Sequence, residues 1–419
     1  MIERTTLDSG VRVVTERMPT LRSVALGVWV GTGSRDESPD LAGASHFLEH
    51  MLFKGTERWS ARGIAEAVEA VGGDMNAFTT HEYTAFYVRV PDEEFDLAAD
   101  ILSDIIREPS FRTEEVDAER QVILEEIRMR DDAPDDVAHE TFGAALFPKH
   151  PIGREVIGSH ETVGDLSRDD IAGYHREHYR SRNLVVAAAG NVDHAQVVER
   201  LGALLVEGDA GDRPARPRPE IGSPLPVAVQ KRPTEQAHVV LGVRSLPRAD
   251  DARWALGAVN QVLGGGMASR LFQEVRELRG LAYSVYSYRA AFEETGAFGI
   301  YVGTGPERVG EALAVIDEQI ERLRRDGGVS AEELRAAQGH LVGSLSLSLE
   351  TAASRMHRIG SSELTLGEVL TVDEVVDKMR SVTPDDVGAV VERLFTDSAM
   401  VLAAVGPFDE SAFADRITT

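Results

Sequence analysis

The sequence predicts an α/β fold of the α+β type, with two tandem, structurally similar domains. Each domain is expected to hold an antiparallel-rich sheet with helices packed on one side. The chain has 419 residues, more than one ordinary hydrophobic core accommodates. Residues 207–226 are rich in proline, glycine and charge and have no apolar period, which is typical of a linker. We therefore place the domains at residues 1–206 and 227–419.

A repeated pattern indicates that the two domains resemble each other. VALGV at Val24–Val28 recurs as VVLGV at Val239–Val243, and LVVAAAGNVD at Leu184–Asp193 recurs as MVLAAVGPFD at Met400–Asp409. Either match alone is an apolar strand followed by a turn, which chance supplies often. Because both matches have nearly the same offset, they indicate a duplicated domain.

The expected elements alternate in the same order in both halves. Apolar or alternating runs predict strands, a 3.6-residue apolar period predicts helices, and Gly72-Gly73 ends the second helix. In the first half we expect strands at Val11–Glu16, Ser23–Val30, Tyr83–Val90 and Leu184–Gly190, and helices at Gly43–Lys54, Ala61–Val71, Glu93–Arg107 and Thr113–Arg130. In the second half we expect a first strand, a helix at Asp251–Leu263 followed by a glycine turn, strands at Tyr283–Ala290 and Gly296–Thr304, long helices and a final strand.

Composition narrows the function classes. The net charge of −26 disfavours binding to nucleic acid, since phosphates would be repelled, and favours cationic peptides; alternatively, the acidity only aids solubility. Without cysteine, neither disulfides nor thiolate metal ligands are possible. The start, MIERTTLDSGVRVV, has no apolar signal core, and no run is long enough to cross a bilayer. We expect a soluble, cytoplasmic protein without a membrane span.

A metal-binding motif stands out at residues 46–50, which read His-Phe-Leu-Glu-His. On a helix, His46 and His50 share a face, so both imidazoles can reach one metal, and Glu49 lies near that face. This is the H-x-x-E-H pattern of zinc peptidases, in which neutral imidazoles hold zinc and the carboxylate accepts a proton from water. With 12 histidines in the chain, a chance match has a probability of roughly a few per cent.

A third ligand is expected from the predicted helix that begins at Thr113. Glu119, Val122, Ile123 and Glu126 follow the spacing of one helix face, whose apolar middle predicts that it packs inward. Carboxylates on a buried face are costly unless they are paired or bound to metal. Since Glu125 points roughly 100° away, we favour Glu126 as the ligand, with Glu119 orienting a histidine. The alternative is an ordinary solvated face.

At this point the chain resembles the pitrilysin/insulinase family of zinc endopeptidases, in the branch of mitochondrial processing peptidase and its bacterial relatives. The resemblance covers essentially the whole chain. The family's third ligand is a glutamate about 76 residues beyond the second histidine, which here is Glu126, and a further glutamate seven residues earlier is Glu119. The resemblance implies one Zn²⁺ per chain, held by His46, His50 and Glu126, with Glu49 as the general base of peptide hydrolysis.

The resemblance also implies where substrate binds. Asn76-Ala77-Phe78-Thr79 is similar to the family's edge strand, to which a peptide adds its backbone as an extra strand. A plain turn is the alternative for this segment. Arg276 and Tyr283 match a pair in the second-half signature: Tyr283 would donate to the developing oxyanion and Arg276 would hold substrate backbone. From spacing alone, these two belong to an amphipathic helix ending at Gly280 and to the strand after it.

Acidic residues after the ligand helix bear on substrate preference. In processing peptidases, acids about 10 and 14 residues beyond the ligand glutamate meet basic substrate residues, and here these positions are Asp136 and Glu140. A solvated loop is the alternative.

Gly264-Gly265-Gly266 lacks the G-K-[ST] of a phosphate loop and is much shorter than the glycine-rich loop of regulatory subunits, so we favour a helix terminator. His175 and His178 have no acidic motif beside them and are interpreted as ordinary helix residues.

Together, these observations predict a zinc metalloendopeptidase that cleaves extended peptides. The alternative is a non-catalytic structural or regulatory subunit of a peptidase-like assembly, although such relatives typically lose the metal motif. Active family members enclose substrate between two halves of two domains each. We therefore expect a homodimer with composite active sites, in which Arg276 and Tyr283 serve the zinc site of the partner.

Overall fold

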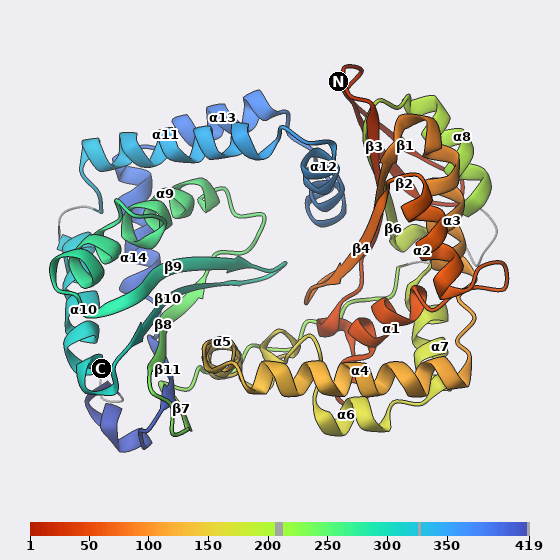
Figure 1. The fold of residues 1–419 in the computed structure, drawn as a ribbon. Helices are drawn as coiled ribbons and strands as arrows, with labels where there is room; N and C mark the ends of the chain where they lie inside the picture. Colours follow the sequence, from red (N-terminus) through yellow and green to blue (C-terminus); the bar gives the residue numbers. More distant parts are fainter. Residues whose placement is uncertain (206–212, 326–327, 417–419) are drawn as a thin grey trace. The chain divides into compact units, whose positions relative to one another are not determined.

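The fold is known from a computed structural model, which describes residues 1–205, 213–325 and 328–416. The chain divides into two compact units (Figure 1). Unit 1 holds residues 1–128, 154–219 and 348–369, and unit 2 holds residues 129–153, 220–347 and 370–419. Each unit is built on one sheet.

The sheet of unit 1 has six strands in the order β1-β2-β6-β3-β5-β4. β2 and β6 are parallel, and the other neighbours are antiparallel. β3 and β6 consist almost wholly of buried apolar and small residues, since the sheet is covered on both faces there. The strands are β1 (Ile2–Thr6), β2 (Arg12–Arg17), β3 (Ser23–Val30), β4 (Asp74–Thr79), β5 (Thr84–Pro91) and β6 (Leu184–Gly190).

The helices of unit 1 cover the two faces unequally. One face carries the larger apolar core, to which α1, α2, α3, α4, α7 and α8 contribute. The opposite face is covered by α12 (Figure 1). Met356 and Ile359 of this helix share one buried apolar cluster with Trp29. The helices are α1 (Ala44–Leu52), α2 (Ala61–Ala70), α3 (Phe95–Arg107), α4 (Thr113–Asp131), α6 (His160–Asp165), α7 (Arg168–His178), α8 (His194–Leu205) and α12 (Ala352–Leu366).

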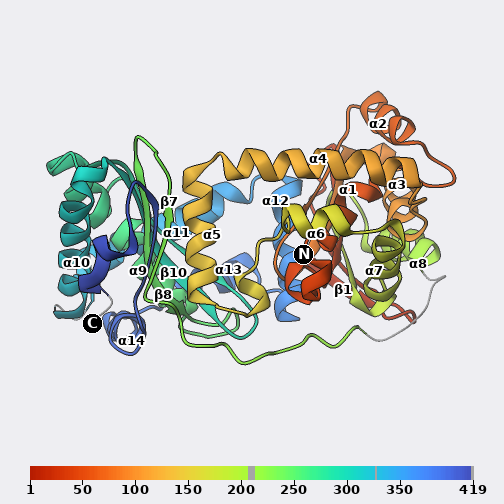
Figure 2. The ribbon, with the colours of Figure 1, turned by 90° about the horizontal axis from the view of Figure 1, so that it is seen from below.

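The sheet of unit 2 has five strands in the order β7-β11-β8-β10-β9. One face packs against α9, α10, α11 and α14, and the other is covered by α5 (Figure 2). The strands are β7 (Val227–Lys231), β8 (Ala237–Ser245), β9 (Ala282–Ala291), β10 (Gly296–Thr304) and β11 (Val401–Gly406). The helices are α5 (Pro134–Leu146), α9 (Arg253–Gly264), α10 (Val309–Arg325), α11 (Ala331–Ser348), α13 (Val372–Arg380) and α14 (Pro384–Phe395).

The two sheets repeat one topology. β2, β6, β3, β5 and β4 of unit 1 correspond in order and direction to β7, β11, β8, β10 and β9 of unit 2, and each sheet has one parallel pair, β2–β6 and β7–β11. The two sequence repeats fall on the corresponding strands β3 and β8, and β6 and β11. The α/β fold of two similar domains is therefore confirmed, with one addition: each sheet also carries a helix on its second face.

The two units depart from the predicted halves at two helices. Residues 129–153, with α5, belong to unit 2, and residues 348–369, with α12, belong to unit 1. Each of these helices buries its apolar side on the sheet of the other half of the chain. Helical periodicity marks such a side but does not say which sheet covers it.

The predicted linker at 207–226 lies partly outside the described residues, which continue from residue 213. Residues 213–226 form neither helix nor strand. Arg216 ties this segment to unit 1, where its guanidinium donates to both carboxylate oxygens of Asp36 at 2.7 and 2.8 Å.

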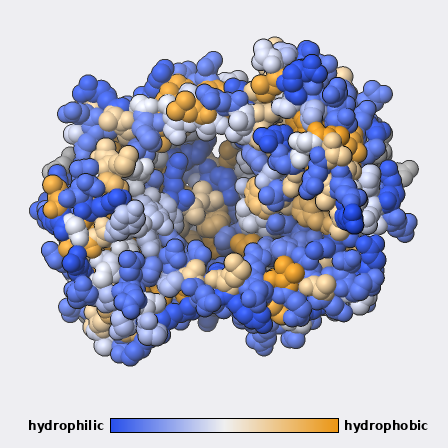
Figure 3. All heavy atoms as spheres, in the orientation of Figure 1, coloured by the Kyte–Doolittle hydropathy of each residue, from blue (hydrophilic) through white to orange (hydrophobic). Residues whose placement is uncertain are grey.

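On the face seen in Figure 3, hydrophilic residues dominate and hydrophobic ones are scattered. Within the described ranges, no helix has the length and apolarity needed to span a bilayer.

Candidate metal centre

The helix α1 carries the histidine motif, and its first turn is anchored by a buried carboxylate. Glu37 accepts backbone hydrogen bonds from Gly43 at 2.8 Å and from Ser45 at 2.7 Å, two donors that the helix itself leaves unpaired. Gly43 has a φ of +96°, and a side chain there would bring its Cβ to 2.8 Å from the Ile157 carbonyl oxygen. The start of α1, two residues before His46, is therefore fixed.

Three possible metal ligands converge where α1 and α4 run side by side (Figures 1 and 2). His46 Nε2 lies 3.8 Å from one carboxylate oxygen of Glu126, and His50 Nε2 lies 3.7 Å from the other. One ligand atom from each of the three residues lies within 4.8 Å of the other two. The structure thus brings together the residues for which the sequence predicts a shared metal.

The chemistry of this donor set fits zinc. Ligand atoms about 2.0–2.1 Å from a tetrahedral zinc ion are about 3.4 Å apart, close to the observed spacings. Burial, helped by His50, lowers the pKa of His46 to about 3, so that its imidazole is neutral and its nitrogen lone pair is available. His46 Nδ1 is itself buried without a hydrogen-bond partner among the described residues. A neutral imidazole presented in this way is the form that zinc binds.

His50 is oriented by Glu119. Its Nδ1 lies 2.7 Å from Glu119 Oε1, and since a carboxylate only accepts, Nδ1–H donates and the lone pair resides on Nε2. Burial lowers the pKa of His50, but Glu119, Glu126 and Glu49 together outweigh burial and raise it above its ordinary value. The surroundings therefore favour a cation at Nε2, whether a proton or a metal.

Lys54 neutralises part of this acidic site. Its ammonium pairs with the second carboxylate oxygen of Glu119, whose side chain is only 6% exposed. Burial raises the pKa of Glu119, but the hydrogen bonds from His50 and Lys54 outweigh burial and lower it. The carboxylates Glu49, Glu119 and Glu126 with one ammonium leave two negative charges when all are ionised, which a divalent cation would balance.

Glu49 lies beside these ligands on α1. Burial raises the pKa of its carboxyl above the ordinary value, while a hydrogen bond from Thr79 and the neighbouring His50 act in the opposite direction. A carboxylate whose pKa is raised, next to possible metal ligands, is suited to accept and return a proton.

The α4 face differs from the predicted face in one respect. Ile123 is fully buried, but Val122 is 50% exposed and the Glu126 side chain is 47% exposed. The buried side of the helix includes Glu119 and Ile123, and Glu126 lies at the edge of that side. Glu125 pairs with Arg128 at 2.6 Å and belongs to no group of possible metal ligands among the described residues. The expected burial of Val122 and Glu126 was therefore wrong, because spacing gives the direction of a side chain but not the edge of the core.

The segment Asn76-Ala77-Phe78 lies on β4, the edge strand of the unit 1 sheet. Within the described residues β4 pairs only with β5, so its other edge is open. The Ala77 N–H donates to Asn76 Oδ1 at 2.8 Å instead of to a strand. The Phe78 ring packs on the sheet face that α12 covers, against Tyr87 and His357. The plain turn considered for this segment is thereby replaced by a strand.

Arg276 and Tyr283 lie together in unit 2. The Arg276 guanidinium carbon is 4.5 Å from the centre of the Tyr283 ring and 4.6 Å from that of Phe272, and Tyr283 is 78% exposed. Residues Phe272–Leu278 form a π-helix where an amphipathic α-helix was expected, and Gly280 follows with a φ of +60°. Such wider turns are frequent at functional sites.

Asp136 and Glu140 lie on α5 and differ in their surroundings. Asp136 is exposed in the first turn of the helix. Glu140 is half-buried and pairs with Arg130 at 2.7 Å. Burial raises the pKa of Glu140, and Arg130 acts in the opposite direction. Of the two acids, Asp136 is thus the one with a solvated carboxylate.

Three other features have structural surroundings. His175 is buried and donates from Nε2 to the Ile106 carbonyl at 2.8 Å, and the buried His178 lies 3.3 Å from the Thr32 hydroxyl. Neither belongs to a group of possible metal ligands in the described part of the chain. The helix α9 ends at Gly264, which is consistent with the interpretation of the glycine run as a helix terminator.

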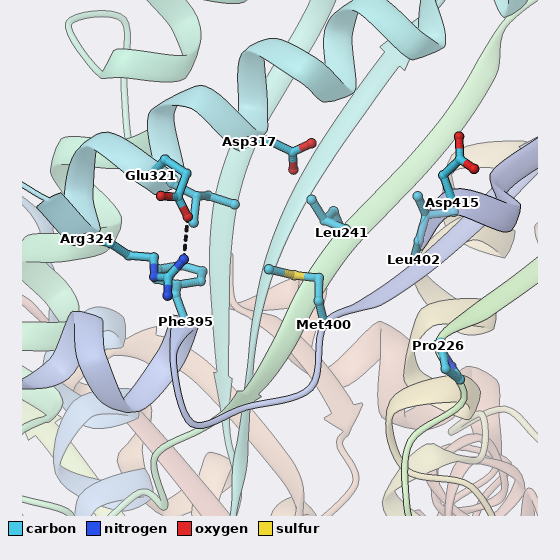
Figure 4. A pocket seen from close by; sticks show the side chains of 10 residues that line it. Pro226, Leu241, Asp317, Glu321, Arg324, Phe395, Met400, Leu402 and Asp415 are labelled. Carbon is cyan, nitrogen blue, oxygen red and sulfur yellow. Dashed lines mark hydrogen bonds and ion pairs between the residues drawn. The ribbon is translucent and has the colours of Figure 1, made fainter. Parts of the chain in front are cut away.

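A separate hollow of about 450 Å³ lies within unit 2 (Figure 4). Its floor is apolar, and its rim carries Asp317, Asp415 and the paired Glu321 and Arg324. The residues that line it include no histidine and none of the predicted site residues. The predicted chemistry therefore does not involve this hollow.

Comparisons with known proteins place the chain in a family. Residues 12–160 match the family described as insulinase, peptidase family M16, and residues 165–341 match the peptidase M16 inactive domain. A protein named as an uncharacterized zinc protease of Streptomyces coelicolor is 45% identical over 416 residues, which cover 98% of this chain and 90% of that protein. The chain belongs to peptidase family M16. Another relative, named as the uncharacterized zinc protease YmxG of Bacillus subtilis, is 41% identical over 410 residues, covering 97% and 98% of the two chains.

Solved structures agree on the fold. A protease from Helicobacter pylori has a TM-score of 0.91 at 23% identity, covering 97% of this chain and 99% of its own. A structure from Pseudomonas fluorescens, described as a peptidase M16 inactive domain, has a TM-score of 0.89 at 20% identity, covering 97% and 98%. At these identities the likeness concerns the M16 fold alone.

Three contacts at the metal centre were not predicted from sequence. Glu37 precedes α1 by several residues, Lys54 follows the motif, and Thr79 belongs to a strand more than 20 residues further on. Only Lys54 had a local signal, because it lies four residues beyond His50 on the same predicted helix. Glu37 and Thr79 reach α1 through tertiary contacts that no spacing rule indicates.

Proposed function

We propose that this M16 chain is a zinc-dependent endopeptidase. The observation that carries the proposal is the convergence of His46 Nε2, His50 Nε2 and the Glu126 carboxylate beside Glu49. Bound there, zinc would supply a Lewis acid and lower the pKa of a water molecule to about 7. The names of the 41–45% identical relatives support the same metal and reaction.

In this proposal Glu49 is the proton carrier. Its Oε2 is held by the Thr79 hydroxyl at 2.5 Å, and Oε1 makes no hydrogen bond to the described residues. Oε1 is therefore the atom that accepts a proton from the attacking water and later passes it to the leaving amine. Glu119 keeps the His50 imidazole in one tautomer throughout, with Nδ1–H donating and Nε2 facing the metal.

Substrate is proposed to bind as an extended strand on β4. The open edge of β4 offers backbone donors and acceptors to any peptide sequence, and a peptide carbonyl could replace Asn76 Oδ1 as the acceptor for Ala77 N–H. Main-chain pairing explains affinity without a fixed recognition sequence. The exposed carboxylate of Asp136 supports a preference for basic residues near the cleaved bond, since Glu140 is already paired.

Assembly is proposed to complete the site. On the family resemblance, Arg276 and Tyr283 of a second copy would hold substrate backbone and donate to the developing oxyanion. The exposed Tyr283 hydroxyl is free to reach a ligand, and the guanidinium stacked on its ring holds that ring in place. A two-fold homodimer is the simplest closed arrangement that gives each chain such a neighbour.

The proposal is tested by metal content and peptide cleavage in purified protein. Wild type should carry about one zinc per chain and cleave a set of unstructured peptides, and chelation should remove both zinc and activity. His46→Ala should lose both, whereas His160→Ala, which alters a histidine of α6 outside the motif, should retain both. Cleavage by His46→Ala at the wild-type rate, or wild-type protein without zinc after growth in zinc-replete medium, would reject the proposal.

A further inference from the structure

The hydroxyl of Thr79 makes the hydrogen bond that fixes Glu49. Thr79 is the last residue of β4, and its Oγ1 lies 2.5 Å from Glu49 Oε2. A carboxylate has no hydrogen to donate, so the threonine is the donor. Among the described residues, no other side chain or backbone group forms a hydrogen bond with the Glu49 carboxylate.

Thr79 is itself held in a rigid hairpin. It pairs with Thr84 at the closed end of β4 and β5, and the turn between them is closed by the Thr80 N–H, which donates to the Tyr83 carbonyl at 2.8 Å. The Thr84 hydroxyl donates to the Thr32 carbonyl at 3.1 Å and lies 3.4 Å from the Thr79 hydroxyl. Because this end of the strand is fixed, Thr79 presents its hydroxyl from one position.

The contact makes the two oxygens of Glu49 inequivalent. Oε2 is committed to Thr79, whereas Oε1 remains free for a proton. Glu49 has three side-chain torsions, and without a partner it would sample several rotamers, only some of which direct an oxygen toward the histidine ligands. A displacement of about 1 Å at a reacting group can cost about 100-fold in rate.

We propose that Thr79 is a positioning residue that aims Glu49 Oε1 at the reacting water, and that it links the substrate-binding edge strand to the general base. This inference rests on the proposed function of Glu49. In this role the Thr79 hydroxyl acts through Glu49 and takes no part in the bond changes itself.

The contact predicts a specific pair of variants. Thr79→Val keeps the size and branching of the side chain but removes the hydroxyl, whereas Thr79→Ser keeps the hydroxyl and removes the methyl group. We expect Thr79→Val to lower kcat about 10- to 100-fold, with KM changed less than about threefold and with zinc content at the wild-type level. Thr79→Ser should recover most of the lost kcat.

A double-variant comparison separates positioning from a structural role. In a Glu49→Gln background the base is absent, so Thr79→Val should cause no further loss in the residual rate. A hydroxyl that only stabilises the hairpin would lower the melting temperature and raise KM in both backgrounds. A Thr79→Val protein with wild-type kcat would overturn the proposal, as would a Thr79→Ser protein that is as slow as Thr79→Val.

Failure of this inference is distinguishable from failure of the proposed function. If wild type cleaves peptides and Glu49→Gln does not, the general base stands, and the Thr79 variants then decide the positioning role alone. If Glu49→Gln is fully active, the base assignment fails and the inference fails with it. Should Thr79→Val not fold, the comparison of Thr79→Ser with wild type still decides, because a retained hydroxyl must retain kcat.

Discussion

Replacing Glu119 with glutamine should weaken zinc binding about tenfold. The carboxylate accepts a hydrogen bond from His50 Nδ1 at 2.7 Å and pairs with Lys54. The amide oxygen of glutamine can still accept from His50, so the loss is the difference between a charge-assisted and a neutral hydrogen bond, about 1–1.5 kcal/mol. Since 1.4 kcal/mol corresponds to a factor of about ten, the zinc Kd should rise about 5- to 12-fold.

Removing the carboxylate altogether should cost more. Glu119→Ala leaves both the His50 Nδ1–H and the Lys54 ammonium without their acceptor, and a loss of about 100-fold in zinc affinity is expected. The assay is zinc competition against a chelating dye at fixed pH and ionic strength. Glu125→Gln on the same helix is the matched control, because among the described residues Glu125 pairs only with the exposed Arg128. Glu119→Ala with wild-type affinity, or Glu125→Gln with the larger loss, would refute the proposed orientation of His50.

Further predictions concern the ligand, the base, the substrate and the assembly. Glu126→Gln should lose zinc in metal analysis while Glu125→Gln keeps it; the reverse order would move the ligand to the other carboxylate. Glu49→Gln should retain zinc but lose turnover by at least about 100-fold, and a wild-type rate would exclude it as the base. Asp136→Asn should reduce cleavage of peptides with arginine near the cut, most visibly at low salt; an unchanged cleavage profile would favour a merely solvated acid. Glu49→Gln and Tyr283→Phe chains, mixed under subunit exchange, should recover roughly a quarter of wild-type activity if sites are composite, and no recovery would place the tyrosine within its own chain.

Much of the fold could be predicted because its signals are local. The buried runs at Ser23–Val30 and Leu184–Gly190 are strands with those same bounds, since a fully buried strand leaves a continuous apolar run. The repeat offset also pointed to a common topology, which the matching strand orders confirm. Edge strands were harder: β1 and β7 have short, partly exposed patterns that resemble loops.

The assignment of helices to sheets could not be predicted from local pattern. α5 and α12 each cover the sheet built mainly from the other half of the chain, so the linker did not mark the boundary of either core. Periodicity records that one side of a helix is apolar, but the covering partner is fixed by tertiary packing.

The candidate metal centre, too, could be predicted only in part. His46, Glu49 and His50 are adjacent in sequence and share a helix turn, so spacing alone brought them together. Helix spacing predicted Glu126 as the third ligand, although its side chain is more exposed than a residue on a buried helix face would be. Thr79 could not have been found, because its contact with Glu49 depends on how the β4–β5 hairpin packs against α1.

The central claim is that one zinc ion is held by His46, His50 and Glu126. Anomalous diffraction from crystals of the zinc-loaded protein, recorded on both sides of the zinc absorption edge, tests it most directly. We expect one strong peak per chain, within about 2.0–2.2 Å of His46 Nε2, His50 Nε2 and a Glu126 carboxylate oxygen. A peak bound by other residues, or zinc-loaded crystals with no peak between α1 and α4, would contradict the claim.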